Sequence, residues 1–297
     1  MKKCKLALVL SLILIMSLLI RSFAFAASET DTEIGYRIKP LLEKLASIKQ
    51  SDIEASLNKY SDMNNHWSRN YVGKLTSLEI ISGMGDGTFR PDQELKVNEF
   101  IKMIVTAMGF KPESGVGSNW AEPYIKIAKE QGIIGEKEFS DYARPIRREE
   151  MARILYLAAM KKEAAPDNTL DDVIRMNIRD FSSIGSDYAQ EVISCYRLGL
   201  LRGTPEYFFY PKKFLTRAEG SVAIINFLDV NARKPFTMTD NYAIQLHNYA
   251  MERELVGDKY HNNGEAKTYV ICRPEKKEEM KVANVLKDSL SKSKGYG

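Results

Sequence analysis

One order of sequence features occurs three times along the chain, and this internal repeat constrains the fold more than any other feature. Each copy begins with an apolar residue four positions before a tyrosine and continues through an amphipathic stretch to an apolar turn flanked by glycine. A second apolar-periodic stretch closes each copy, and the copies occupy residues 60–110, 111–160 and 178–230. One helix pair of this size cannot bury its apolar face, so the copies must pack on one another. The sequence therefore predicts an all-α, mainly helical fold of three helix–loop–helix repeats.

The second helix of each repeat opens on a short polar motif, which reads FLTRAEG in the third repeat. Thr216 and Glu219 have the spacing of a capping box, in which each side chain accepts the backbone N–H of the other residue. Glu99 and Glu150 occupy the matching position in the first and second repeats. Arg217 is unexpected at a helix start, because the positive end of the helix dipole favours anions. Either it pairs with a surface carboxylate, or it and the helix end converge on an anionic ligand.

The N-terminus has the pattern of a secretory signal peptide. A lysine-rich start precedes an apolar run over residues 6–20, and Ala-Phe-Ala then ends at Ala26. This order is typical of a signal peptide cleaved after the last alanine, and the run is shorter than the roughly 20 residues of a membrane span. An uncleaved anchor is the alternative. We expect residues 1–26 to be removed, which leaves a secreted chain with no membrane association.

The charge balance of the remaining chain argues against nucleic acid as a partner. The full sequence has 43 basic and 39 acidic residues, and residues 1–26 contain four of the basic residues and no acid. Cleavage would therefore leave 43 − 4 = 39 basic against 39 acidic residues. A protein that binds the phosphate backbone normally presents a basic face. We expect no nucleic-acid partner.

The sequence offers little for catalysis. It has three histidines, and neither an H-E-x-x-H nor a G-x-S-x-G motif. His247, His261 and Cys272 match no common metal-site spacing. Cys195 lies in an apolar helical pattern and reads as a small buried side chain, although a disulfide to Cys272 stays open. We therefore expect no enzyme activity, no metal and no cofactor.

These motifs together carry a resemblance to a known family. The chain resembles proteins with three tandem S-layer homology (SLH) domains over roughly residues 60–229. The residues that carry it are Trp67, the run GMGDGTFRP at residues 83–91, and the motif LTRAE at residues 215–219, in triplicate order behind the signal peptide.

The resemblance implies a pseudo-threefold arrangement around a central helix bundle, with grooves between the repeats. It further implies a noncatalytic module that anchors proteins to the wall of a Gram-positive-type envelope by binding secondary cell-wall polysaccharide, often through a pyruvate ketal. Other S-layer or envelope proteins are possible partners, and the location would be the cell surface. The arginine of the motif is the usual carboxylate contact in the family, and groove aromatics and loop glycines help to hold the sugar. The positions that this assigns to polysaccharide binding here are Arg217, Arg148, Lys96, Trp67, Trp120, Asp62, Asp180, Gly83, Gly135 and Gly203.

Several of these residues have a second interpretation. Trp67 and Trp120 either stack on a sugar ring or pack as apolar staples at the start of a helix. Asp62 and Asp180 either cap a helix or accept sugar hydroxyl groups, and capping is the commoner use of such a residue.

The repeats depart from the family pattern in different places. Repeat 1 has the best glycine–aspartate loop, but Val97 stands where the motif has arginine, so Lys96 would have to act as a less directional point charge. Repeat 2 keeps Arg148 and Glu150 but has an eroded loop, and repeat 3 keeps the whole motif but lacks the tryptophan. We infer one or two working grooves.

The flanking segments suggest further elements and two alternative functions. Residues 27–59 have helical apolar spacing, residues 161–177 form a polar linker, and residues 231–297 form an unassigned α/β extension with a disordered tail. An S-layer or envelope structural protein that assembles through the extension is one alternative to the anchor. A secreted wall-associated enzyme is a weaker one.

Overall fold

The computed structural model describes residues 33–113 and 119–237. The described chain is helical, which confirms the predicted all-α class, and three isolated bridges are its β-type pairings. The helices are α2 (Glu33–Ser47), α3 (Gln50–Leu57), α4 (Arg69–Ser77), α5 (Val97–Ala107), α6 (Glu122–Glu130), α7 (Arg148–Ala159), α8 (Asp171–Asn177), α9 (Ala189–Leu198) and α10 (Arg217–Leu228). The short 3₁₀ turns are η1 (Ser61–Met63), η3 (Phe181–Ser183), η4 (Ser186–Tyr188) and η5 (Val230–Ala232).

Two predicted segments lie outside the described residues: the signal peptide at residues 1–26, and the extension beyond residue 237, which includes Cys272. Cys195 is buried. None of the described helices is long and apolar enough to cross a bilayer.

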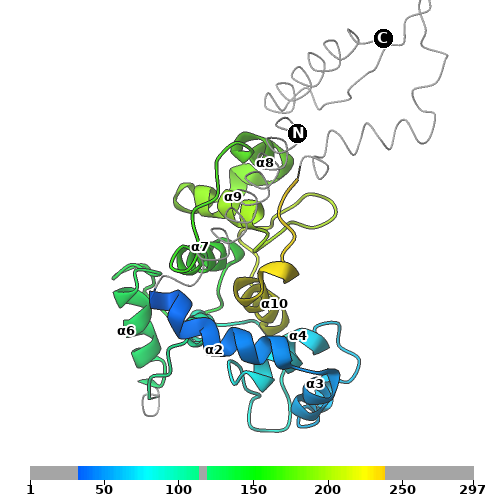
Figure 1. Ribbon diagram of the computed structural model, residues 1–297. Helices are drawn as coiled ribbons and strands as arrows, with labels where there is room; N and C mark the ends of the chain where they lie inside the picture. Colours follow the sequence, from blue (N-terminus) through cyan, green and yellow to red (C-terminus); the bar gives the residue numbers. More distant parts are fainter. Residues whose placement is uncertain (1–32, 114–118, 238–297) are drawn as a thin grey trace, which may run out of the picture. The chain divides into compact units, whose positions relative to one another are not determined.

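The second helices of the three repeats form a bundle. Helices α5, α7 and α10 pack pairwise against one another, and α10 also contacts α4, which lies beside α3 (Figure 1). Their apolar residues are almost fully buried, among them Phe100, Ile104, Leu155 and Phe227. Each of these helices has too little surface to be stable alone in water, so burial of the shared face is the main stabilising term.

A closed ring of backbone hydrogen bonds ties the starts of the three bundle helices together. The N–H of Leu95 donates to the carbonyl of Leu215 (2.7 Å), that of Leu215 to Ile146 (3.2 Å), and that of Ile146 to Leu95 (2.9 Å). All three side chains are buried, and buried backbone groups must find partners inside the protein. The ring satisfies three donors and three acceptors at equivalent places of the three repeats. It fixes the register of the three motifs relative to one another.

The chain divides into two compact units, and the third repeat contributes to both. Residues 33–165 and 214–232 belong to one unit, whereas residues 166–213 and 233–237 belong to the other. The first unit therefore contains α2 to α7 and α10, with the leading segment folded as the helix pair α2 and α3. The second contains α8, packed on α9. Helix α8 lies in the stretch that the sequence suggested as a polar linker.

Candidate functional site

The start of α10 contains a complete capping box. The N–H of Thr216 donates to Glu219 Oε2 (2.9 Å), and the N–H of Glu219 donates to Thr216 Oγ1 (3.2 Å). In the other two motifs the glutamate still accepts the N–H of the capping residue, at 3.0 Å for Glu99 and 2.8 Å for Glu150. Those capping residues are lysine and arginine, whose side chains cannot accept a hydrogen bond. The reciprocal half of the box is therefore specific to α10.

The first N–H groups of α10 are used within the protein. The N–H of Arg217 donates to the carbonyl of Gln93 (2.9 Å) and that of Ala218 to the carbonyl of Pro91 (2.9 Å). Both acceptors lie in the loop of the first repeat, residues 82–93. The N–H of Glu219 is taken by Thr216. The first turn thus offers no N–H group to a bound anion, and the expectation that the helix end itself cradles the ligand is wrong. The loop of repeat 1 is what caps the helix of repeat 3.

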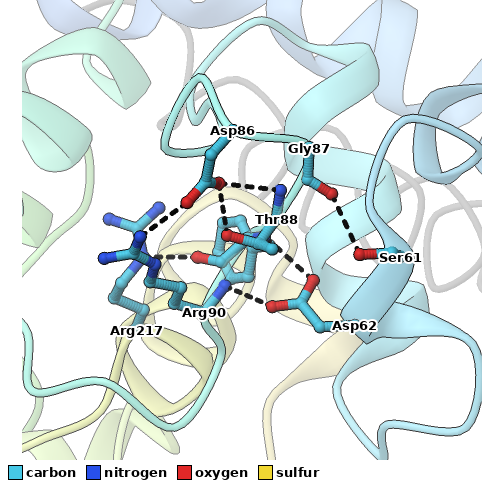
Figure 2. A network of polar contacts seen from close by, with 8 residues as sticks. Ser61, Asp62, Asp86, Gly87, Thr88, Arg90 and Arg217 are labelled. Carbon is cyan, nitrogen blue, oxygen red and sulfur yellow. Dashed lines mark hydrogen bonds and ion pairs between the residues drawn. The ribbon is translucent and has the colours of Figure 1, made fainter.

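The Arg217 side chain points away from solvent and across to that same loop. Its Nε donates to the carbonyl of Phe89 and its Nη2 to the carbonyl of Ser82, both at 2.9 Å (Figure 2 shows the contact with the loop). The guanidinium carbon lies 4.5 Å from the centre of the Phe89 ring, and Nη1 lies 3.7 Å from Glu99 Oε1. The residue is 9% exposed. Arg217 therefore pairs with a carboxylate, but as part of a buried contact between repeats and not on the surface.

Burial and the Glu99 carboxylate have opposite effects on the pKa of Arg217. Removal from water lowers the pKa of Arg217, and the nearby Glu99 carboxylate opposes that shift. An arginine remains charged under such conditions because its ordinary pKa lies far above neutral pH. The guanidinium is a permanent positive charge beneath the loop.

Asp62 holds the loop from its other side. Its carboxylate accepts the N–H groups of Phe89 (2.9 Å) and Arg90 (2.7 Å) (Figure 2). Arg90 has a φ of 58°, which is uncommon for a residue with a Cβ. The two hydrogen bonds stabilise the backbone at this strained position. Asp62 is exposed, and the contact that its carboxylate makes is with the loop.

The tip of the loop is closed by Asp86. Its carboxylate accepts hydrogen bonds from the N–H and hydroxyl of Thr88 and from the Arg90 guanidinium (Figure 2). The Thr88 side chain, followed by Arg90, lowers the pKa of Asp86 to about 2. Gly85 and Gly87 have φ values of 85° and 81°, so the two glycines permit the turn. The glycine–aspartate run is a tight, internally bonded turn.

A pocket of about 320 Å³ lies beside this loop. Residues from all three repeats line it: Ile80, Ile81, Ser82, Gly83, Met84, Phe89, Glu99, Lys102, Met103, Trp120 and Arg217. A Cβ on Gly83 would meet Tyr60 Cε1 at 2.4 Å and the Thr88 carbonyl at 2.6 Å, so only glycine fits in this wall. Pockets of roughly 300 Å³ and above are typical of small-ligand sites. Four of the predicted residues come together here: Arg217, Trp120, Gly83 and Glu99.

The two tryptophans have different surroundings. Trp120 is half-buried in the pocket, with the Lys102 ammonium 5.6 Å from its ring centre. Trp67 is 60% exposed and lies against the His66 ring at 5.4 Å, and it does not line the pocket.

The other predicted residues of this unit also lie elsewhere. Lys96 is exposed at the start of α5, and Arg148 is half-buried at the start of α7. The N–H of Gly135 donates to Glu138 Oε2 (2.7 Å), and a Cβ would fit there.

The second unit contains an aspartate–loop contact equivalent to that of Asp62. Asp180 accepts the N–H groups of Phe209 and Tyr210, both at 2.7 Å, and Tyr210 has a φ of 56°. A Cβ on Gly203 would meet the Tyr196 hydroxyl at 2.6 Å and the Phe208 carbonyl at 2.8 Å. These contacts match those of Asp62 and Gly83 at corresponding places of repeat 1. The aspartate–loop bond is therefore a recurrent structural feature of the repeats, distinct from helix capping.

Val97 shows what happens where the motif lacks arginine. Its N–H donates to the carbonyl of Arg144 (3.0 Å), just as the N–H of Arg217 donates to Gln93. The Val97 side chain is fully buried. The Arg144 guanidinium is bound by both oxygens of Glu150, at 2.9 and 2.7 Å. Val97 therefore supplies no charge at the place equivalent to Arg217.

Sequence reasoning missed Lys102 and Phe89. Lys102 is one of many lysines on helices, and its sequence position gives no signal beyond a place three residues after Glu99. Phe89 belongs to the quoted loop, yet its role as the surface against which Arg217 lies depends on contacts 128 residues apart in the chain. Both roles follow from tertiary structure.

The chain is similar to known proteins over this region. The model of the S-layer homology domain matches residues 59–96 and 177–219. An exoglucanase XynX of Acetivibrio thermocellus is 28% identical over 179 residues, which is 57% of this chain and 16% of the relative. An endoglucanase of Bacillus sp. (strain KSM-635) is 27% identical over 200 residues, which is 64% of this chain and 21% of the relative.

A third relative has a different kind of name. A cellulosome-anchoring protein of Acetivibrio thermocellus is 32% identical over 89 residues, which is 30% of this chain and 19% of the relative. The chain thus spans about a fifth or less of the length of these three relatives. The matched segments include Asp62 and its counterpart Asp180, which both bind a loop. The segment 177–219 also includes the motif at Arg217. The resemblance seen in the sequence is confirmed for two of the three predicted repeats, and the second repeat stays a prediction: this chain carries the S-layer homology domain, matched at residues 59–96 and 177–219.

Proposed function

We propose that this chain is a noncatalytic module that anchors protein to the cell surface by binding an acidic secondary cell-wall polysaccharide, and that the pocket beside the Gly83–Phe89 loop is the binding groove. The observation that carries the proposal is the composition of that pocket. It combines two cations, Lys102 and Arg217, with the Trp120 ring and a backbone wall that only glycine permits.

The chemistry suits a sugar that bears a fixed carboxylate. Aromatic side chains offer a flat apolar face to a sugar ring, and positive charges favour a carboxylate over a neutral sugar. A pyruvate ketal is such a carboxylate, which agrees with what the family resemblance implies. The low volume of the pocket suits one terminal residue of a polysaccharide and not an extended chain.

The relatives support a role other than catalysis. Proteins named as an exoglucanase, an endoglucanase and a cellulosome-anchoring protein are each similar to part of this chain. Matches to enzymes and to an anchoring protein alike, each over about a fifth or less of the relative, are what an attachment segment carried by different proteins would produce. We extend that function to this chain.

Wall sedimentation tests the proposal. The purified chain is mixed with cell walls from a Gram-positive-type envelope that have been stripped of protein but keep their polysaccharide, and bound protein is separated by centrifugation. We expect the chain to sediment with these walls and to be released when the ketal pyruvate is removed by mild acid. Equal sedimentation with walls that lack the polysaccharide would contradict a polysaccharide-binding function.

A further inference from the structure

Two of the charged side chains in the pocket, Arg217 and Glu99, make most of their contacts with each other and with the loop. Two nitrogens of the guanidinium donate to backbone carbonyls, and the third faces the Glu99 carboxylate at 3.7 Å. The face of the group lies on the Phe89 ring. The Glu99 carboxylate also accepts the Lys96 N–H. A ligand would have to displace one of these contacts to bind Arg217 through two parallel hydrogen bonds.

Lys102 has a different environment. It lies on α5, half-buried, and its ammonium is 5.6 Å from the ring centre of Trp120 and 5.8 Å from that of Tyr124. In the described parts of the chain, residues 33–113 and 119–237, no carboxylate lies within ion-pair distance of it. Aromatic faces hold a cation in place without neutralising its charge. Lys102 is therefore both positioned and available.

The charge count of the pocket leads to the same residue. Its ionisable lining side chains are Glu99, Lys102 and Arg217, so two cations and one carboxylate leave one positive charge. Because the carboxylate is paired with Arg217, the uncompensated charge belongs to Lys102. A site with one uncompensated positive charge favours a ligand with one negative charge.

We propose that Lys102 is the specificity-determining cation of this pocket, which takes the single carboxylate of an acidic sugar, and that Arg217 is a positioning residue that holds the loop opposite. This inference rests on the proposed function of the pocket and names the residue that selects the ligand. Lysine suits the task because its ammonium carries three rotatable donors and needs no fixed ligand geometry. Trp120, which contacts the same ammonium, fixes the distance between the charge and the apolar surface for the sugar.

The test measures affinity for two forms of one probe. The probe is wall polysaccharide that carries pyruvate ketals, compared with the same polysaccharide after mild acid has removed them. The variants are Lys102→Gln, Lys102→Arg and Arg217→Lys, and Lys126→Gln is the matched control. Lys126 lies on α6, its side chain is 73% exposed, and it pairs with Glu130, so this control removes one charge outside the pocket.

We expect Lys102→Gln to weaken binding of the ketal-bearing probe about tenfold or more, because it removes the charge that meets the carboxylate. The ketal-free probe should bind the unaltered chain and Lys102→Gln equally weakly, and Lys102→Arg should keep most of the affinity for the ketal-bearing probe. Lys126→Gln should bind like the unaltered chain. Arg217→Lys should shift the amide NMR signals of Gly83, Gly85 and Gly87, because its shorter side chain cannot reach both carbonyls, whereas Lys102→Gln should leave them in place.

The outcomes separate this inference from the proposed function. If the unaltered chain prefers the ketal-bearing probe but Lys102→Gln binds it equally well, the assignment of Lys102 is wrong and the proposed function stands. If Lys102→Gln weakens both probe forms equally, Lys102 does not read the carboxylate, and the assignment also fails. Unchanged glycine signals in Arg217→Lys would overturn the positioning role. If the unaltered chain binds neither form, both the function and the inference fail.

Discussion

Replacement of Arg217 by alanine should destabilise the unit that contains it. The change removes two hydrogen bonds of 2.9 Å from a charged donor, the stacking on Phe89 and the ion pair with Glu99. A hydrogen bond to a charged group contributes about 1.5–3 kcal/mol net. Ser82 is exposed, so water can replace one of the lost donors, whereas the carbonyl of Phe89 belongs to a buried residue. We therefore expect a loss of about 2–4 kcal/mol in the free energy of unfolding.

The assay can be confined to this unit. The chain has two tryptophans, Trp67 and Trp120, and both belong to the unit that contains Arg217. Chemical unfolding followed by tryptophan fluorescence therefore reports on that unit. In thermal unfolding a loss of this size corresponds to a fall in Tm of roughly 5–15 °C for a unit of this length.

A matched control separates this effect from a general loss of charge. Lys126→Ala removes an exposed cation from an i,i+4 pair with Glu130, and such pairs contribute about 0.3–0.5 kcal/mol. We expect it to unfold at nearly the denaturant concentration of the unaltered chain. If Arg217→Ala were no more destabilising than Lys126→Ala, the guanidinium would not hold the loop, and the account of Arg217 as a buried structural contact would be refuted.

Two further changes probe the loop itself. Asp62→Ala leaves the N–H groups of Phe89 and Arg90 without their acceptor, and it should lower the free energy of unfolding by about 1–3 kcal/mol in the fluorescence assay; an unchanged midpoint would show that water replaces the carboxylate fully. Asp86 has its pKa lowered to about 2, against about 3.9 in an unfolded chain. Its contribution to stability is therefore present above about pH 4 and is lost as the pH falls through 2. A carboxyl NMR titration should find a midpoint near 2 that rises in Arg90→Ala, and a midpoint near 4 in the unaltered chain would contradict the hydrogen bonds to Thr88 and Arg90.

Local chemistry is what made much of this fold predictable. The three bundle helices begin at Val97, Arg148 and Arg217, each directly after the residue identified as the cap of its motif. The Thr216–Glu219 box depends on residues three positions apart, so the sequence contains all of it. The leading helices and the first helices of the repeats follow from apolar periodicity in the same way. These are interactions whose partners are close in sequence.

The partners of Arg217 could not be predicted in this way. Helix dipole and capping rules describe the first turn of a helix as it meets water, and they left Arg217 with two interpretations, a surface ion pair or an anionic ligand. In the structure the neighbouring loop takes the N–H groups of Arg217 and Ala218, and it also takes the guanidinium. Helix α8 was missed for a related reason, since its seven residues carry a weak apolar pattern and depend on packing against α9.

Because the motif of one repeat contacts the loop of another, departures from the family pattern are better compared between motif–loop pairs than between repeats. Judged repeat by repeat, this chain has no intact copy, because repeat 1 keeps the loop without the arginine and repeat 3 keeps the arginine without the tryptophan. The ring through Leu95, Ile146 and Leu215 places the motif of repeat 3 against the loop of repeat 1.

The best-preserved loop and the best-preserved motif therefore meet in one pocket, to which repeat 2 adds Trp120. At the next equivalent position the motif of repeat 1 contacts the loop of repeat 2. Both segments depart from the family pattern, and Val97 stands in place of arginine. The departures from the family pattern in repeats 1 and 2 thus lie together at the Val97 position, and the pocket beside Arg217 keeps both its loop and its motif. The pocket beside Arg217 is therefore the place where a full motif, a glycine–aspartate loop and a tryptophan coincide, which favours it over the Val97 position as the proposed binding groove.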